Sequence, residues 1–100
     1  MSEPYNFQQG YVLLKRKTSW VRRFATVHNS VFTYRNSHAD ARPKATINLQ
    51  TAKIMEGRLK GTQKYIYIQQ DPFKAEAIRI TFQTMEEYSQ WLESVQLGRL

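Results

Sequence analysis

The sequence predicts a mainly β domain, in which seven short strands are followed by one C-terminal α-helix. Short segments with alternating apolar and polar residues occupy most of the chain up to residue 83, a pattern typical of half-buried strands. Turn-forming residues separate these segments. After residue 84 the apolar residues recur every three or four positions instead, which indicates an amphipathic helix.

The predicted strands are bounded by turn and loop signals. Asn29-Ser30 and Asp71-Pro72 are typical of turns, and the polar stretches 36–43 and 57–63 predict longer loops. The strands expected between these signals span residues 10–16, 20–28, 31–35, 44–50, 52–56, 64–70 and 76–83.

The helix is predicted over residues 84–96. Thr84 followed three residues later by Glu87 is a capping box, and Gly98 is a suitable terminator. Its apolar stripe includes Tyr88 and Trp91. We expect this stripe to pack against one end of the sheet, because no other apolar surface is available to cover it.

Composition limits the possible functions. One hundred residues form a single domain, and the absence of cysteine excludes disulfides and thiolate–metal sites. His28 and His38 show no metal-ligand spacing, and no nucleophile–base pattern is visible, so we expect no metal, no cofactor and no enzyme activity. The formal net charge is +7, and 11 of the 15 basic residues lie in residues 1–60. This uneven charge favours an anionic partner.

The cations are densest between the first two predicted strands. Lys15, Arg16, Lys17, Arg22 and Arg23 lie within nine residues, on either side of the Thr18-Ser19 turn. A hairpin would gather them at one end of the sheet, where phosphate is the commonest ligand for such a cluster. Nucleic acid is disfavoured, because the aromatic residues alternate with core residues and do not line the basic face.

The order of these elements and several motifs resemble a pleckstrin-homology (PH) domain. The matching features are Gly10-Tyr11-Val12, Lys15, Trp20, Arg23-Phe24-Ala25, the stretch VFTYRNSHADARPKATINL, and the helix tryptophan Trp91. Within the family, residues 20–52 look most like the domains at the tail of vesicle-carrying kinesins. The resemblance implies a lead-in at residues 1–9 and a PH domain at 10–98. It also implies a seven-stranded antiparallel barrel or sandwich of two near-orthogonal sheets, capped by the helix.

The resemblance also implies a function. Many PH domains bind phosphoinositide headgroups between the loops after strands one, three and six, through a lysine late in strand one and a basic-x-Arg triplet in strand two. Lys15 and Arg23 match this motif, but Val21 stands where the family has its first basic residue of the triplet. Such a module would dock a larger protein onto a cytoplasmic membrane leaflet, with a bisphosphorylated lipid as the expected ligand. The alternative is a peptide-binding domain on the same fold without specific lipid binding.

The expected site residues form two groups. Those assigned to phosphoinositide binding are Lys15, Lys17, Arg23, Tyr34, Arg35 and Lys44, and those assigned to nonspecific electrostatic attraction are Arg16 and Arg22. Arg23 could instead pair with Asp40, and Tyr34 could belong to the edge of the core. The register of the first strand is open as well: if Leu13 faces the core, Lys15 and Lys17 reach the pocket, whereas if Leu14 does, Arg16 takes that place.

Overall fold

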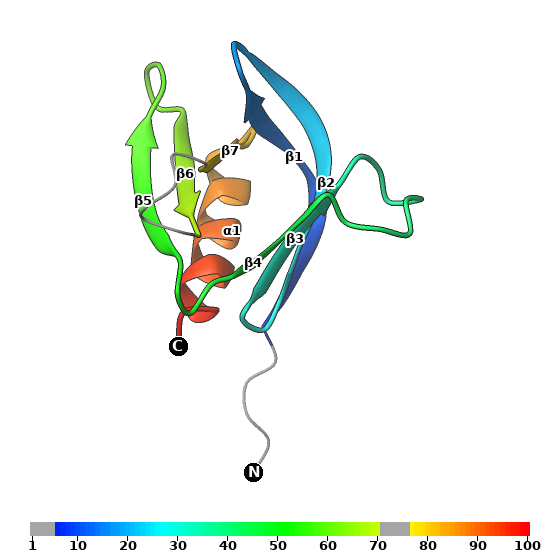
Figure 1. Cartoon of the computed structure of the whole chain (residues 1–100). Helices are drawn as coiled ribbons and strands as arrows, with labels where there is room; N and C mark the ends of the chain where they lie inside the picture. Colours follow the sequence, from blue (N-terminus) through cyan, green and yellow to red (C-terminus); the bar gives the residue numbers. More distant parts are fainter. Residues whose placement is uncertain (1–5, 71–76) are drawn as a thin grey trace.

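The computed structural model describes residues 6–70 and 77–100 of the chain. Seven strands precede one helix in this part (Figure 1). The elements are β1 (Phe7–Arg16), β2 (Ser19–His28), β3 (Val31–Arg35), β4 (Ala45–Asn48), β5 (Lys53–Arg58), β6 (Lys64–Gln69), β7 (Ile78–Thr81) and α1 (Met85–Leu97). The predicted fold class, seven antiparallel strands and a C-terminal helix, is confirmed.

The strands form one continuous sheet in the order β4-β3-β2-β1-β7-β6-β5. β1 pairs with β2 along its whole length and with β7 only at Leu13 and Leu14, so the sheet bends sharply at this short contact. The two sheets expected from the sequence are therefore the two halves of one sheet, which enclose the core together with α1 (Figure 1). β4 and β5 are the edge strands, and the sheet does not close between them.

Several predicted boundaries shift because backbone pairing extends or shortens a strand beyond its local pattern. β1 begins at Phe7 instead of residue 10, since Phe7 pairs with His28 and their rings meet edge to face at 6.1 Å. β5 continues to Arg58, through residues predicted as a loop, because Gly57 lies directly opposite Tyr65. β7 is shorter than predicted, and residue 76 of that prediction lies outside the described residues.

The helix is confirmed and packs against the core through its predicted stripe. Thr84 is its N-cap, and the Thr84 Oγ1 accepts a 3.1 Å hydrogen bond from the Glu87 backbone N–H. Tyr88, Trp91 and Val95 are buried. The Trp91 ring stacks on Phe82 with centroids 6.0 Å apart, so the helix covers part of the apolar interior, as expected.

The register of β1 is decided in favour of Leu14. Val12 and Leu14 are only 3% and 2% exposed, whereas Leu13 is intermediate and lies on the other face. Because successive side chains alternate across a strand, Arg16 shares the inner face of the sheet with Val12 and Leu14. Lys15 then shares the outer face with its cross-strand partner Trp20.

A glutamine side chain bridges the open side of the sheet. The Gln70 Oε1 accepts a 2.7 Å hydrogen bond from the Asn48 N–H at the end of β4, and the Gln70 Nε2 donates a 2.9 Å bond to the Thr51 hydroxyl. These bonds connect the end of β6 to the segment that joins β4 to β5. They hold the two halves of the sheet at a fixed separation where backbone pairing is missing.

Candidate functional site

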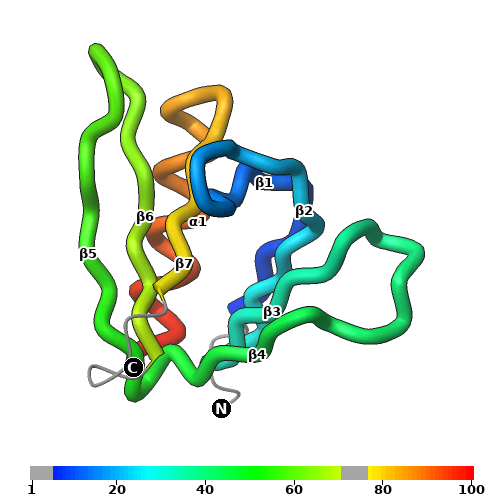
Figure 2. Tube along the Cα trace, turned by 45° about the horizontal axis from the view of Figure 1, so that its top comes forward, coloured from blue at the N-terminus to red at the C-terminus, as the bar shows by residue number. Residues whose placement is uncertain are grey.

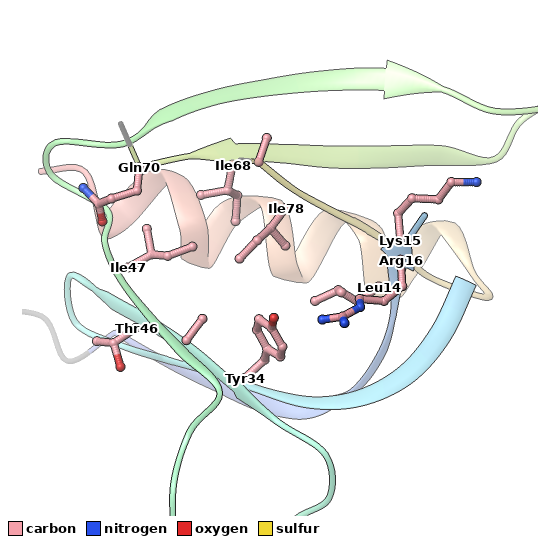
Figure 3. Close-up of a pocket in the computed structure, with 11 residues that line it drawn as sticks. Leu14, Lys15, Arg16, Tyr34, Thr46, Ile47, Ile68, Gln70 and Ile78 are labelled. Carbon is pink, nitrogen blue, oxygen red and sulfur yellow. The ribbon is translucent and has the colours of Figure 1, made fainter. Parts of the chain in front are cut away.

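A cavity of ≈ 570 Å³ lies between the two halves of the sheet, where β1 and β3 end and β7 begins. Its walls are mainly apolar, and Figure 3 shows the side chains that surround it. The lining residues are Leu14, Lys15, Arg16, Tyr34, Ala45, Thr46, Ile47, Ile68, Gln70, Ala77 and Ile78. The cavity lies at the open end at which the resemblance to PH domains implies a ligand.

Arg16 and Lys15 occupy opposite faces at the cavity. The Arg16 guanidinium lies beside Leu14 at the cavity, and the Lys15 side chain leads away from it (Figure 3). On the outer face, the Lys15 ammonium is 5.3 Å from the centroid of the Trp20 ring. Of the two alternatives left open by the sequence, the structure therefore shows the one in which Arg16 reaches the pocket.

Arg23 lies on the inner face of β2, opposite Val12, but it does not line the cavity. Its Nη1 donates a 2.8 Å hydrogen bond to the Arg22 carbonyl. Its Nε is buried without a hydrogen-bond partner among the described residues. The alternative pairing of Arg23 with Asp40 is not among its contacts in that part of the chain.

Tyr34 and Arg35 point to opposite sides of β3. Tyr34 is 8% exposed and lines the cavity, so it belongs both to the core edge and to the candidate site. Arg35 pairs with Phe24 on the outer face, and its Nη1 donates a 2.8 Å hydrogen bond to the Asp40 carbonyl. The structure therefore does not bring Arg35 to the cavity. Lys44 donates its backbone N–H to the Tyr34 carbonyl at 2.7 Å, which places it near the rim, although it is not a lining residue.

The remaining predicted cations lie outside the cavity. Lys17 occupies the β1–β2 turn with φ 52°, a left-handed conformation that costs a non-glycine residue about 1 kcal/mol. Its side chain is exposed at the tip of the hairpin. Arg22 stacks over Tyr11 on the outer face, 4.0 Å from the ring centroid. Arg22 therefore lies outside the cavity, and its assignment to nonspecific attraction stays a prediction.

The β3–β4 loop is held against the outer face of the sheet by contacts that the sequence did not predict. The Tyr11 hydroxyl and the His38 Nδ1 are 2.7 Å apart, and the His38 backbone N–H donates to the same hydroxyl at 3.2 Å. The His38 ring also meets Phe24 edge to face at 6.1 Å. Figure 2 shows the loop extending away from β3 and β4. Arg35 and His38 together therefore position this loop.

Local sequence patterns also gave no signal for most of the cavity wall. The wall is built from strands that are distant in the sequence. It includes Ile47 of β4, Ile68 of β6, Gln70 directly after β6, and Ile78 of β7. Alternation predicts that the isoleucines face inward. It carries no information on which inward residues remain uncovered, because that depends on how far apart the two halves of the sheet lie.

Comparison with known proteins identifies the family. The PH-domain family model matches residues 6–98. The chain belongs to the PH-domain family. The domain also resembles solved PH domains at low sequence identity, which supports the fold alone. The matches give no support to the narrower resemblance to kinesin tails, which stays a prediction.

Three solved structures illustrate the similarity of fold. The PH domain of human oxysterol-binding protein-related protein 11 has a TM-score of 0.72 and 17% identity, covering 93% of this chain and 79% of that one. The PH domain of the human KIAA0053 protein has a TM-score of 0.78 and 13% identity, covering 99% and 92%. The Slm1 PH domain, solved in complex with inositol-4-phosphate, has a TM-score of 0.72 and 11% identity, covering 93% and 96%.

A comparison with curated proteins found no significant match to the sequence. In residues 6–70 and 77–100, the single helix is too short and too polar to cross a membrane.

Proposed function

We propose that this PH domain binds phosphoinositide headgroups and thereby docks a larger protein onto the cytoplasmic leaflet of a membrane. The observation that carries the proposal is the β1–β2 hairpin, which ends beside the cavity in three consecutive cations, Lys15, Arg16 and Lys17. Arg16 and Lys17 are exposed, and neither contacts a carboxylate within the described part of the chain. Their charge is therefore free to attract an anionic surface.

The binding mechanism follows from charge and geometry. Each cation near an anionic leaflet contributes about 1 kcal/mol of attraction. The planar Arg16 guanidinium can then bind a headgroup phosphate with two parallel hydrogen bonds. Arg23, with its buried and unpaired Nε, is the expected second contact. Trp20 lies half-buried beside Lys15 on the outer face of the same hairpin, where indole favours the depth of the headgroups. The likeness in fold to the Slm1 PH domain, solved with inositol-4-phosphate, supports the choice of ligand.

The experiment is vesicle sedimentation with a bisphosphorylated phosphoinositide and, in parallel, with plain anionic lipid. Arg16→Ala and Arg23→Ala should each lower phosphoinositide affinity about 10- to 100-fold, since a hydrogen bond to a charged group contributes roughly 1.5–3 kcal/mol. Lys15→Ala should act in the same direction less strongly, because an ammonium lacks the fork geometry.

The matched control is Arg22→Ala, which removes the same charge from the outer face of the same strand. It should weaken binding only modestly and mainly at low salt. An equal loss for Arg22→Ala and Arg23→Ala would show diffuse electrostatic attraction and no specific site. If none of these substitutions changes vesicle binding, the membrane function is wrong.

A second candidate function is peptide binding at a sheet edge. The observation that favours it is the open sheet, in which β4 and β5 each have one edge without a strand partner among residues 6–70 and 77–100. An extended peptide can add a strand to such an edge. Vesicle binding that does not depend on phosphoinositide content would favour this second function over the first.

A further inference from the structure

We propose that the cavity between the two halves of the sheet is a binding site for a single-chain anionic amphiphile, a long-chain carboxylate. The apolar chain occupies the interior, and the carboxylate pairs with Arg16 at the mouth. This site uses the inside of the cavity and shares only Arg16 with the headgroup contacts proposed above, which otherwise lie on the hairpin and β2. The inference therefore does not depend on the phosphoinositide proposal.

Part of the cavity wall is aliphatic, and the cavity is of suitable size. Leu14, Ile47, Ile68 and Ile78 contribute branched aliphatic side chains to its wall, and Figure 3 shows them around one common space. Its volume of ≈ 570 Å³ lies within the range of about 300–1,000 Å³ that small-molecule sites occupy. Such a surface binds alkyl chain and offers little to a polyhydroxylated inositol ring, whose hydroxyl groups would lose their water without replacement.

One guanidinium lies at the mouth of the cavity. The Arg16 guanidinium enters it, whereas the Lys15 side chain leads away (Figure 3). The Gln70 amide also lines the cavity but already bonds to Asn48 and Thr51. One guanidinium matches one carboxylate through two parallel hydrogen bonds. A ligand with several phosphates would need further cations, and among the described residues the only other charged lining residue is Lys15, whose side chain leads away.

Tyr34 provides a second donor for the same anionic group. Its ring lines the cavity, and its hydroxyl has no hydrogen-bond partner among the described residues. It is not one of the buried polar atoms that lack a partner, so it is accessible and can donate to a ligand. Arg16 and Tyr34 would thus bind the charged end of the amphiphile, and the aliphatic wall would bind its chain.

The expected ligand is a single-chain molecule taken from water rather than a bilayer lipid. Moving one methylene from water into an apolar site changes the binding constant about fourfold, the equivalent of about 0.8 kcal/mol. The chains of a diacyl lipid are already in an apolar environment within the bilayer, so transfer into the cavity gains nothing. A monomeric long-chain carboxylate gains this free energy for each methylene it buries.

The test is a calorimetric titration of the full chain with hexanoate, octanoate and decanoate, each below its critical micelle concentration. Affinity should rise about fourfold per added methylene until the cavity is full. Decyltrimethylammonium, with a similar chain and the opposite charge, should bind at least tenfold more weakly than decanoate. Affinity that is independent of chain length, or equal for the two head groups, would overturn the proposal.

Two variants assign the binding to this cavity. Arg16→Gln should weaken decanoate binding about tenfold, whereas Lys17→Gln, at the exposed hairpin tip outside the cavity, should leave it unchanged. Ala45→Leu adds bulk to the wall without changing any charge, and should weaken decanoate binding at least tenfold while retaining cooperative unfolding. Decanoate affinity that is unaffected by Arg16→Gln and by a folded Ala45→Leu variant would exclude this site.

Binding of soluble inositol 1,4,5-trisphosphate, measured on the same samples, separates this inference from the proposed function. If the carboxylates bind with an affinity that rises with chain length and inositol trisphosphate does not bind, the cavity site is supported and the headgroup contacts are refuted. If inositol trisphosphate binds and hexanoate, octanoate and decanoate displace it equally well, the cavity site is refuted.

Discussion

Replacing Trp91 with alanine should remove a large part of the stability of the domain. Trp91 is 3% exposed, its ring stacks on Phe82 at 19° between planes, and its Cζ2 lies 4.0 Å from the position of a Cβ on Gly10. A buried tryptophan removes about 150–250 Å² from water, which corresponds to about 4–6 kcal/mol at about 25 cal/mol per Å². Trp→Ala substitutions in cores cost about 3–5 kcal/mol, in agreement with this figure.

This loss is comparable to the whole free energy of unfolding of a small domain, about 5–15 kcal/mol. Heat and urea denaturation followed by circular dichroism measure it directly. At about 4–8 °C per kcal/mol for a domain of this size, the thermal midpoint should fall by about 12 °C or more.

Two controls make the Trp91 experiment decisive. Trp91→Phe keeps an aromatic ring against Phe82 and should cost clearly less than the alanine variant. Met85→Ala, on the same helix but exposed, should change the midpoint little. A Trp91→Ala midpoint within about 2 °C of the parent would show that the helix does not stabilise the core, and would refute the packing described above.

Three further predictions concern other contacts of the fold. Gly98→Ala should destabilise the domain by about 1–3 kcal/mol in urea denaturation, because the new Cβ would lie 2.5 Å from the Leu49 Cδ1. An unchanged urea midpoint would mean that the chain end can move away from Leu49. Burial, and to a smaller extent the hydrogen bond that the Tyr88 hydroxyl donates to the Glu56 carboxylate, raises the pKa of Tyr88 above its usual value. As the pH rises, the unfolded chain should therefore lose the Tyr88 phenol proton first, near pH 10. The free energy of unfolding should fall above about pH 10. Tyr88→Phe should reduce that fall, measured as the difference in stability between pH 8 and pH 11. Gln70→Ala leaves the Asn48 N–H unpaired at the open side of the sheet and should cost about 0.5–1.5 kcal/mol, with faster amide exchange at Asn48 as the specific readout.

Local patterns in the sequence were sufficient for the elements of the fold and for the position of the charge. Alternation predicted every strand, and the change to a spacing of three and four residues predicted the helix with Thr84 as its cap. The buried stripe of Tyr88 and Trp91 followed from the same spacing. These properties depend on residues within a few positions of each other, so they can be read from the chain alone.

The placement of individual side chains at the candidate site depended on the tertiary structure. Leu13 and Leu14 are adjacent and equally apolar, so local pattern could not decide which faces the core. Pairing of β1 with β2 and β7 decided it, and placed the Arg16 side chain, rather than that of Lys15, on the inner face at the cavity. The docking of His38 on Tyr11 likewise joins residues 27 positions apart.

The sequence by itself determined that this chain is a strand-rich PH domain with a basic hairpin. Only the tertiary structure decided that the space beside this hairpin is a cavity with a partly aliphatic wall and the Arg16 guanidinium at its mouth. The physical reason is that a cavity is bounded by residues far apart in sequence, such as Leu14 and Ile68, whose separation is set by the bend of the sheet and by the Gln70 bridge. A one-dimensional pattern specifies which face of a strand is apolar, but the distance between two such faces arises only when the sheet folds over its core.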